Sequence, residues 1–379
     1  MSTFDRYLLR LFVKVLFACF LSMVGLYIVI DAFGNLDEFI GYGRERGGFL
    51  KVLADYYSAR VPWFFDHASG LLALVAGMFA ITWLQKTNEL TALMAAGITT
   101  KRIVRPLIAA AALVSIVAAL NRELVIPEVR DKLVRNAQDW LGESAKQVDP
   151  VTDNRTDILI GGRASFAAEQ RIQEPTFTLH RPLGEYGRKL IAENAFYREP
   201  AGGRPGGYLL EGVTIPAEHA TLPSASLEGE PVILSSFDNS DWLLPNQLFV
   251  VSDVTFSDLA CGSQYRAFAS TRELVTGLSN PSLDFGLRTR VSMHARFVQP
   301  LLDMTLFVLG LPLVLTRQNR SVFVAAGLGI AIVIAYFAVT SACQAMGASG
   351  FLMSPALAAW APLIILAPTA AALSQPIWE

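Results

Sequence analysis

The sequence predicts an α-helical membrane protein that carries an inserted all-β domain. Of its 379 residues, 53% are hydrophobic and only 17% are charged, whereas about a quarter of the residues in a soluble domain are charged. Several apolar runs also reach the roughly 20 residues that a helix needs to cross a bilayer. These runs fall into two groups, separated by a long and more polar segment.

Six transmembrane helices are expected, three in each group. The first apolar run follows a basic start, "MSTFDRYLLR", as a signal peptide would. The run is longer than the apolar core of a signal peptide, and no small-residue cleavage site follows it before Asp31, so we expect a retained span. The predicted spans cover residues 8–30, 68–85, 103–121, 296–315, 321–346 and 352–373.

The segment between the two groups predicts β structure. It contains short alternating stretches such as "RTDILI", "GYLLEGVTI" and "NQLFVVSDVTF", and alternation bounded by Gly, Pro, Asn and Asp is typical of strands. Many short strands without helical periodicity indicate a sandwich or a jelly-roll-like domain. The predicted domains are therefore 1–122 with the first three spans, 123–290 with the β domain, and 291–379 with the last three spans.

The orientation in the membrane follows from the basic residues of the short loops. Lys and Arg outnumber Asp and Glu at the N-terminus and in the loop after the second span, which contains Lys86 and Lys101. Short loops rich in Lys and Arg remain in the cytoplasm. Because three spans precede it, the β domain is expected on the opposite side of the membrane.

Enzyme signatures are missing from the sequence. The stretch "GGRPGG" at 202–207 has the glycines of a phosphate-binding loop but not its Lys-Ser/Thr pair. The zinc, paired-cysteine and serine-nucleophile motifs do not occur, and the four histidines share no ligand spacing. We therefore expect no catalytic site, metal or cofactor. The net charge of −2 argues against nucleic acid as a partner.

Asp303 lies inside the fourth predicted span, in "FVQPLLDMTLFVLGLPLVL". A carboxylate at that depth is costly unless it is paired, neutral or facing a cavity, so it marks a candidate functional site. The alternative is a polar tie between helices, for example with Gln299.

Four arginines are candidates for contacts with anionic lipid headgroups. Arg44 and Arg46 follow the first span, and Arg122 and Arg130 follow the third. The alternative is that they belong to solvated helix faces, balanced by neighbouring acidic residues.

The stretch "NELTALMAAGITTKR", residues 88–102, predicts a short helix over 88–97. Asn88 suits an N-cap and Gly97 a C′ position. A stripe at helical spacing follows, consisting of Leu90, Leu93, Met94 and Gly97. A helix without a polar face is normally buried, here in the membrane interface, among the protein's own spans or in a groove of a partner. Its small residues and its one acid, Glu89, favour a partner.

The stretches "NELTALMAAGITTKRIVRPLI" and, one span later, "NRELVIPEV" resemble the LptF/LptG permeases of lipopolysaccharide export. The predicted order of three spans, a β-jelly-roll domain and three spans resembles that family too. The resemblance covers essentially the whole chain and is most specific in 86–130 and 290–315. Asp66 and His67, before the second span, depart from the family pattern.

The resemblance implies a permease subunit of an ABC transporter in the bacterial inner membrane. It would extract lipopolysaccharide and pass it to a periplasmic jelly-roll bridge protein, and its first and fifth spans would form lateral gates with a second LptF/LptG-type permease. Helix 88–97 would be a coupling helix seated in a cytoplasmic ABC ATPase dimer. The implied coupling residues are Glu89, Leu90, Leu93, Met94, Ala96 and Gly97.

The sequence is compared with three alternative functions. A mechanotransmitting ABC permease carries no lipid itself, but it has four spans with the outer domain after the first. A membrane-bound enzyme needs a reactive cluster, which the sequence does not show. A periplasmic scaffold protein leaves the helix at 88–97 unexplained.

Overall fold

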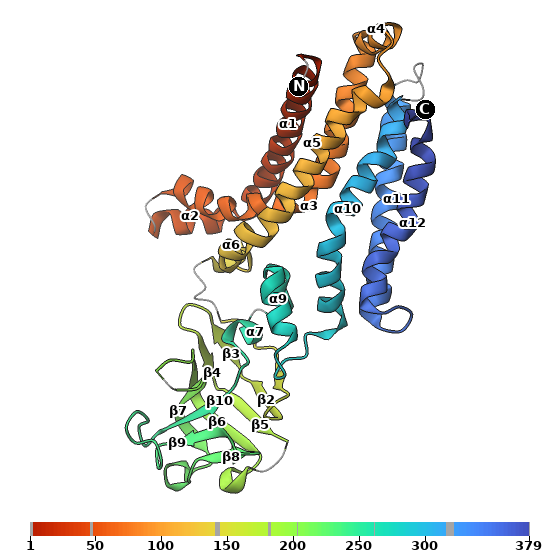
Figure 1. Cartoon of the computed structure of the whole chain (residues 1–379). Coiled ribbons are helices and arrows are strands. Elements are labelled where there is room, and N and C mark those ends of the chain that lie inside the picture. The colour runs from red at the N-terminus through yellow and green to blue at the C-terminus, as the bar shows by residue number, and fades with distance from the viewer. Residues whose placement is uncertain are drawn as a thin grey trace. The chain divides into compact units, whose positions relative to one another are not determined.

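The computed structural model describes residues 3–45, 48–140, 145–180, 183–202, 204–260, 262–315 and 322–378. The chain forms two compact units. The helical unit comprises Met1–Val129 and Gly286–Glu379, and the β unit comprises Arg130–Phe285. Figure 1 shows the elements of each. Arg46, one of the proposed headgroup contacts, lies outside the described residues.

Within the described part of the chain, six helices are long and apolar enough to cross a membrane. This confirms the predicted three-plus-three arrangement. The helices are α1 (Thr3–Gly34), α3 (Phe49–Lys86), α5 (Thr100–Leu120), α10 (Gly286–Leu315), α11 (Val322–Ser349) and α12 (Pro355–Trp378). α5 continues through a π-helical turn, η1 (Asn121–Val125), into α6 (Ile126–Leu133). α1 begins and α12 ends at the end of the helical unit that carries α4 (Glu89–Ala95) (Figure 1).

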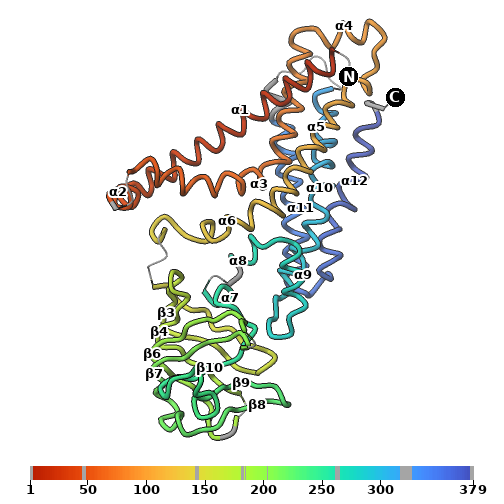
Figure 2. Tube along the Cα trace, turned by 60° about the vertical axis from the view of Figure 1, so that its left-hand side comes forward, coloured from red at the N-terminus to blue at the C-terminus, as the bar shows by residue number. Residues whose placement is uncertain are grey.

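The helix of the second span begins well before the predicted apolar run, at Phe49 instead of residue 68. Its first half contains Asp55, Arg60 and Asp66, which lower the hydropathy of the segment without preventing a helix. α2 (Leu36–Glu45), which was not predicted, lies at the turn between α1 and α3 (Figure 2). Phe39 of α2 is fully buried, with its ring 5.0 Å from that of Tyr56.

Two apolar clusters form the core of the helical unit, and α10 contributes to both. The first joins the start of α1 to α3, α4, α5 and α10, and its fully buried members include Leu8, Leu84, Ile103 and Phe307. The second joins α10 to α11 and α12. α3 and α10 approach closely at Gly77, where a Cβ would lie 2.6 Å from the ring of Phe307.

The β unit is built on a ten-stranded antiparallel sheet with the order β1-β2-β5-β6-β7-β10-β9-β8, and β4 joins β3 to β6. The strands are β1 (Val151–Asp153), β2 (Ile158–Gly161), β3 (Ala164–Phe166), β4 (Arg171–Gln173), β5 (Thr176–Leu179), β6 (Lys189–Arg198), β7 (Gly207–Ile215), β8 (Ala225–Leu227), β9 (Glu230–Ser235) and β10 (Gln247–Val251). Its main apolar core contains Ile160, Phe177, Leu190, Tyr208 and Leu248, and a smaller cluster contains Leu243, Phe249 and Val251. The inserted all-β domain, jelly-roll-like in character, is confirmed.

Three short helices that were not predicted follow the last strand: α7 (Phe256–Ala260), α8 (Gly262–Ala267) and α9 (Thr271–Leu278). α9 begins with a capping box, which satisfies two backbone donors at once. The hydroxyl of Ser270 accepts a hydrogen bond from the amide of Glu273 at 3.2 Å. The amide of Ser270 donates in return to the Glu273 carboxylate at 2.7 Å.

Candidate functional site

The first candidate site is α4, the short helix between the second and third spans. Its C-terminus is a Schellman motif, with the amide of Gly97 bonded to the carbonyl of Met94 and that of Ile98 to Leu93, both at 3.0 Å. Gly97 has a φ of 79°, as this motif requires, so its predicted role as the C′ residue is confirmed. The expected N-cap bond is not made, because Asn88 has a left-handed φ of 59° and its side chain caps nothing.

The two sides of α4 have different environments. Leu90 is only 2% exposed and, with Leu93 beside it, packs into the chain's own core. Met94 is 43% exposed. The exposed surface of the helix is formed by Thr91, Ala92, Met94, Ala95, Ala96 and Gly97. The stripe expected from the spacing is therefore divided: its two leucines anchor the helix, while Met94 and the small residues face outward.

The start of α1 is bonded to α4 and to the start of α5. The hydroxyl of Tyr7 donates to the Glu89 carboxylate at 3.3 Å. The guanidinium of Arg102 makes two hydrogen bonds to the carboxylate of Asp5, at 2.8 and 3.0 Å. Paired bonds of this kind fix the orientation of both groups.

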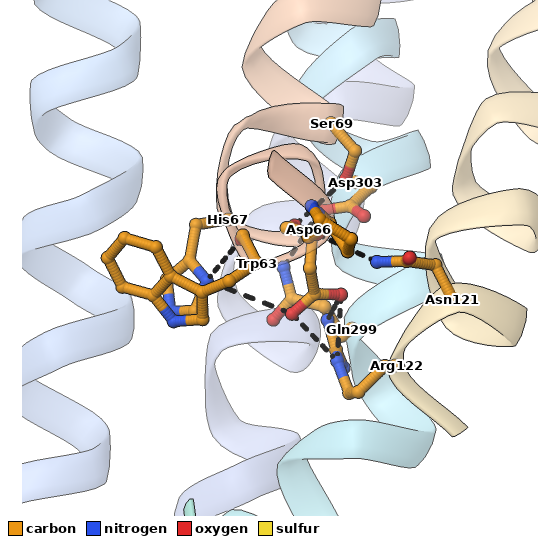
Figure 3. Close-up of polar contacts among 9 residues, drawn as sticks. Trp63, Asp66, His67, Ser69, Asn121, Arg122, Gln299 and Asp303 are labelled. Carbon is orange, nitrogen blue, oxygen red and sulfur yellow. Dashed lines mark hydrogen bonds and ion pairs between the residues drawn. The ribbon is translucent and has the colours of Figure 1, made fainter. Parts of the chain in front are cut away.

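The second candidate site is a group of polar side chains on α3, η1 and α10, with bonds between α3 and η1 and a separate bond within α10 (Figure 3). Arg122 and Asp66 form an ion pair at 2.8 Å, and their side chains are only 17% and 7% exposed. Asn121 donates to the backbone carbonyl of Pro62 at 2.8 Å. Both Asn121 and Arg122 lie in the π-helical turn, and such turns occur frequently at functional sites.

Asp303 lies in the same region of the helical unit and is 7% exposed. It accepts a hydrogen bond from Gln299, one turn earlier in α10, at 2.8 Å. Gly70 of α3 makes room for it, because a Cβ there would lie 2.6 Å from the Asp303 carboxylate. Among the described residues, no cation lies within ion-pair distance of Asp303. The hydroxyl of Tyr336 on α11 is buried and lacks a hydrogen-bond partner in the described part of the chain.

Two of the proposed headgroup arginines are occupied by carboxylates of the chain itself. Arg122 is held by Asp66. Arg130 pairs with Glu273 at 2.7 Å and lies over the ring of Tyr265, 4.4 Å from its centroid. Both arginines are therefore paired within the chain, by partners that lie far away in the sequence. Their contact with lipid headgroups stays a prediction. Arg44 lies exposed on α2.

An apolar groove of about 550 Å³ runs between α3 and α11. One wall is a helical stripe of α3 that includes Leu71, Met78 and Trp83, and Lys86 lies in the same stripe at the end of the helix. Ile330 and Val333 form part of the opposite wall. No group of three or more His, Cys, Asp or Glu in the described residues is placed to hold a metal ion.

Comparison with protein families gives one match. The family described as "Lipopolysaccharide export system permease LptF/LptG" matches residues 6–375. The match covers nearly the whole chain and includes the β unit as well as the helices on both sides of it. The comparison with curated proteins gave no match.

Proposed function

The chain belongs to the LptF/LptG family of lipopolysaccharide export permeases, and from this membership we propose that it carries lipopolysaccharide out of the bacterial inner membrane. It is a multi-pass transport component, not an enzyme in its own right. ATP would be hydrolysed by a separate cytoplasmic ABC ATPase dimer. The observation that carries the proposal is the position of α4, an exposed helix of small residues between two spans of a chain that matches this family from end to end.

The orientation of the chain supports a cytoplasmic partner for α4. Lys86, Lys101, Arg102 and Arg105 flank the helix, and basic short loops remain in the cytoplasm. The alanines and the glycine of its outward surface offer close approach to another protein at little cost in side-chain entropy, and Met94 adds an exposed apolar contact. A groove on the ATPase would accept this surface, and Leu90 and Leu93 would hold the helix in place from behind.

The lipid path is proposed from the exposure of the spans. In the apolar window of α1 only 6% of the residues are buried, and in that of α11 only 22%, the two lowest values among the six helices. Such apolar faces need lipid or another protein against them. They suit the proposed role of the first and fifth spans as lateral gates shared with a second LptF/LptG-type permease.

The β unit would receive the lipid on the periplasmic side. Three spans separate it from the N-terminus, so the chain reaches it on the side opposite α4. The main strand order of the sheet ends in the edge strands β1 and β8, and β3 pairs with only one other strand, β4. Unpaired edges can add a strand from another sheet, which would permit pairing with the jelly-roll bridge protein.

Co-purification from the native membrane tests the proposal. We expect a small ATPase and a second permease to accompany the chain, and Met94→Asp to release the ATPase by placing a charge on the docking surface. Leu244→Asp is the control, because Leu244 is an apolar side chain in the β unit that is even more exposed than Met94, at 64% against 43%. An ATPase that remains bound to Met94→Asp would contradict docking through α4. An ATP-driven movement of the spans without lipid release would favour mechanotransmission.

A further inference from the structure

The first turns of α1 are linked to both ends of the segment that carries α4. Tyr7 bonds to Glu89, the first residue of α4, and Asp5 bonds to Arg102 near the start of α5. Asp5 and Arg102 are 97 positions apart in the chain. The contact is therefore a tertiary link between α1 and the α4 segment and is not a consequence of local sequence.

Apolar packing strengthens the same junction. Leu8 is fully buried and Phe12 is 1% exposed, in a cluster that also contains Leu90 of α4 and Ile103 of α5. The N-terminal part of α1, α4 and the start of α5 therefore share one core. A displacement of α4 would be transmitted to this part of α1.

The middle of α1 is different. Phe17 and Leu21 are exposed, but the ring of Phe20 packs edge-on against that of Phe65 on α3 at 5.7 Å. Closer to α2, the ring of Tyr27 lies 4.5 Å from that of Phe64 on α3. There Asp31 also accepts a hydrogen bond from Tyr57 at 2.7 Å. α1 is thus bonded at both ends, to α4 and α5 at one end and to α3 at the other, and it also packs against α3 through Phe20 between them.

α3 and α5 are joined to α4 by short stretches of backbone, so they must move when α4 moves. α1 lies far from α4 in sequence and depends on side-chain contacts. Among the ties in the described residues, the Asp5–Arg102 pair is the most directional, because the two hydrogen bonds fix distance and angle together. The carboxylate of Asp5 is also nearly buried, so water competes little with Arg102 for its hydrogen bonds.

We propose that Asp5 and Arg102 are positioning residues that transmit the movement of α4 to α1. When the ATPase displaces α4, the pair pulls the first turns of α1 with it, and α1 pivots about its aromatic contacts beside α2. Without the pair, α4 moves but α1 follows incompletely, so that ATP is hydrolysed with less lipid released. This inference rests on the proposed function, since it takes α4 as the point where the ATPase acts.

Charge reversal tests the link in the complete complex. Asp5→Arg and Arg102→Asp each replace attraction by repulsion, and the double variant restores an opposite-charge pair. Arg105→Asp is the matched control, because Arg105 is exposed one turn later in α5 and has no ion pair in the described part of the chain. Asp5→Asn, which keeps the shape of the side chain, is available if a reversal prevents folding.

Two quantities are measured in proteoliposomes containing lipopolysaccharide. The first is lipid released per ATP hydrolysed. The second is the nucleotide-dependent distance between spin labels at Leu21 on α1 and Ile364 on α12, both exposed. We expect the single reversals to keep ATPase binding but to lower the lipid-to-ATP ratio about fivefold or more, the lower bound of typical coupling between sites. They should also lose the distance change, and the double variant should regain both.

Single reversals that keep the wild-type ratio and distance change would overturn the link. So would a double variant as impaired as the singles. An unaltered complex that changes the α1 distance with ATP but releases no lipid would refute the proposed cargo and leave the link supported. An unaltered complex in which ATP moves nothing would overturn both.

Discussion

Replacing Arg122 by methionine removes one partner of the ion pair that ties the π-helical turn to α3. The two side chains lie 2.8 Å apart and are 17% and 7% exposed, so the Asp66 carboxylate would remain almost buried without a permanent counter-charge. The imidazole of His67, 3.8 Å from it, is charged only when protonated. Loss of one partner from a buried pair costs about 3–5 kcal/mol. The remaining exposure of Arg122 gives access to water, so we expect a loss of about 3 kcal/mol, at the lower end of this range.

A double variant separates the effect of the unpaired charge on stability from the effect of altered packing. In the double variant Asp66→Leu, Arg122→Met, apolar side chains replace both charges, and such replacements are often close to neutral. We therefore expect most of the lost stability to return. The assay is reversible unfolding of the purified chain in mixtures of mild detergent and dodecyl sulfate. A loss of about 3 kcal/mol corresponds to roughly a hundredfold change in the unfolding equilibrium.

A loss below about 1 kcal/mol in Arg122→Met would show that the pair is worth no more than a surface salt bridge. A double variant as unstable as the single variant would also refute the reasoning, because the cost would then come from altered packing and not from an uncompensated charge.

Three further predictions concern the remaining contacts. Gly70→Ala should destabilise the helical unit by about 1–3 kcal/mol, because its methyl group would collide with Asp303; the same unfolding assay measures it. Tyr208→Phe should cost about 1–3 kcal/mol in unfolding of the β unit, since a buried 2.9 Å hydrogen bond to the carbonyl of Val254 is lost. Glu273→Gln should reduce the loss of stability of the full chain in acid, measured by denaturant titration at several pH values.

The sign of the acid effect follows from the surroundings of Glu273. Partial burial would raise the pKa of its carboxyl group, but the bonds from Ser270 and the charge of Arg130 outweigh burial and lower the pKa. A lowered carboxyl pKa stabilises the fold above the unfolded value of about 4.3, and that contribution is lost as the pH falls through the folded pKa. Equal acid sensitivity in wild type and Glu273→Gln would contradict this assignment.

Gly25→Ala serves as the control for Gly70→Ala. Gly25 also lies within a spanning helix, but a Cβ there has no neighbour within 4 Å. We expect it to be neutral or slightly stabilising, since alanine is the better helix former. Equal destabilisation by both substitutions would show that the Gly70 effect does not arise from contact with Asp303.

The spans were predictable because hydropathy is a local property of the sequence. Their lengths were not, since the polar first half of α3 is helical without being apolar. α2 and α7–α9 are short. α2 is held by the contacts of Phe39 with the tyrosines of α3, whereas α9 has a local signal in its capping box. The alternation of apolar and polar residues identified the β domain, but the order of its strands depends on pairing between segments far apart in the sequence.

In the candidate sites, too, local features could be predicted and long-range contacts could not. Asp303 was identifiable as a lone carboxylate in an apolar run. Asp66 and Arg122 were both noticed, yet 56 positions separate them and their pairing depends on the π-helical turn. In α4, the terminating role of Gly97 could be predicted from its chemistry. The outward side of α4 could not, because apolar and small residues occur on both of its faces.

Photo-crosslinking in the complete complex tests whether ATP drives the transfer of lipopolysaccharide from the spans to the β unit. A photoreactive amino acid at Leu227, in edge strand β8 and packed against the β core, would report lipid that reaches this domain. We expect crosslinks to lipopolysaccharide that appear with ATP and disappear in Met94→Asp. Crosslinks to protein alone, or to lipid at equal yield without ATP, would contradict it.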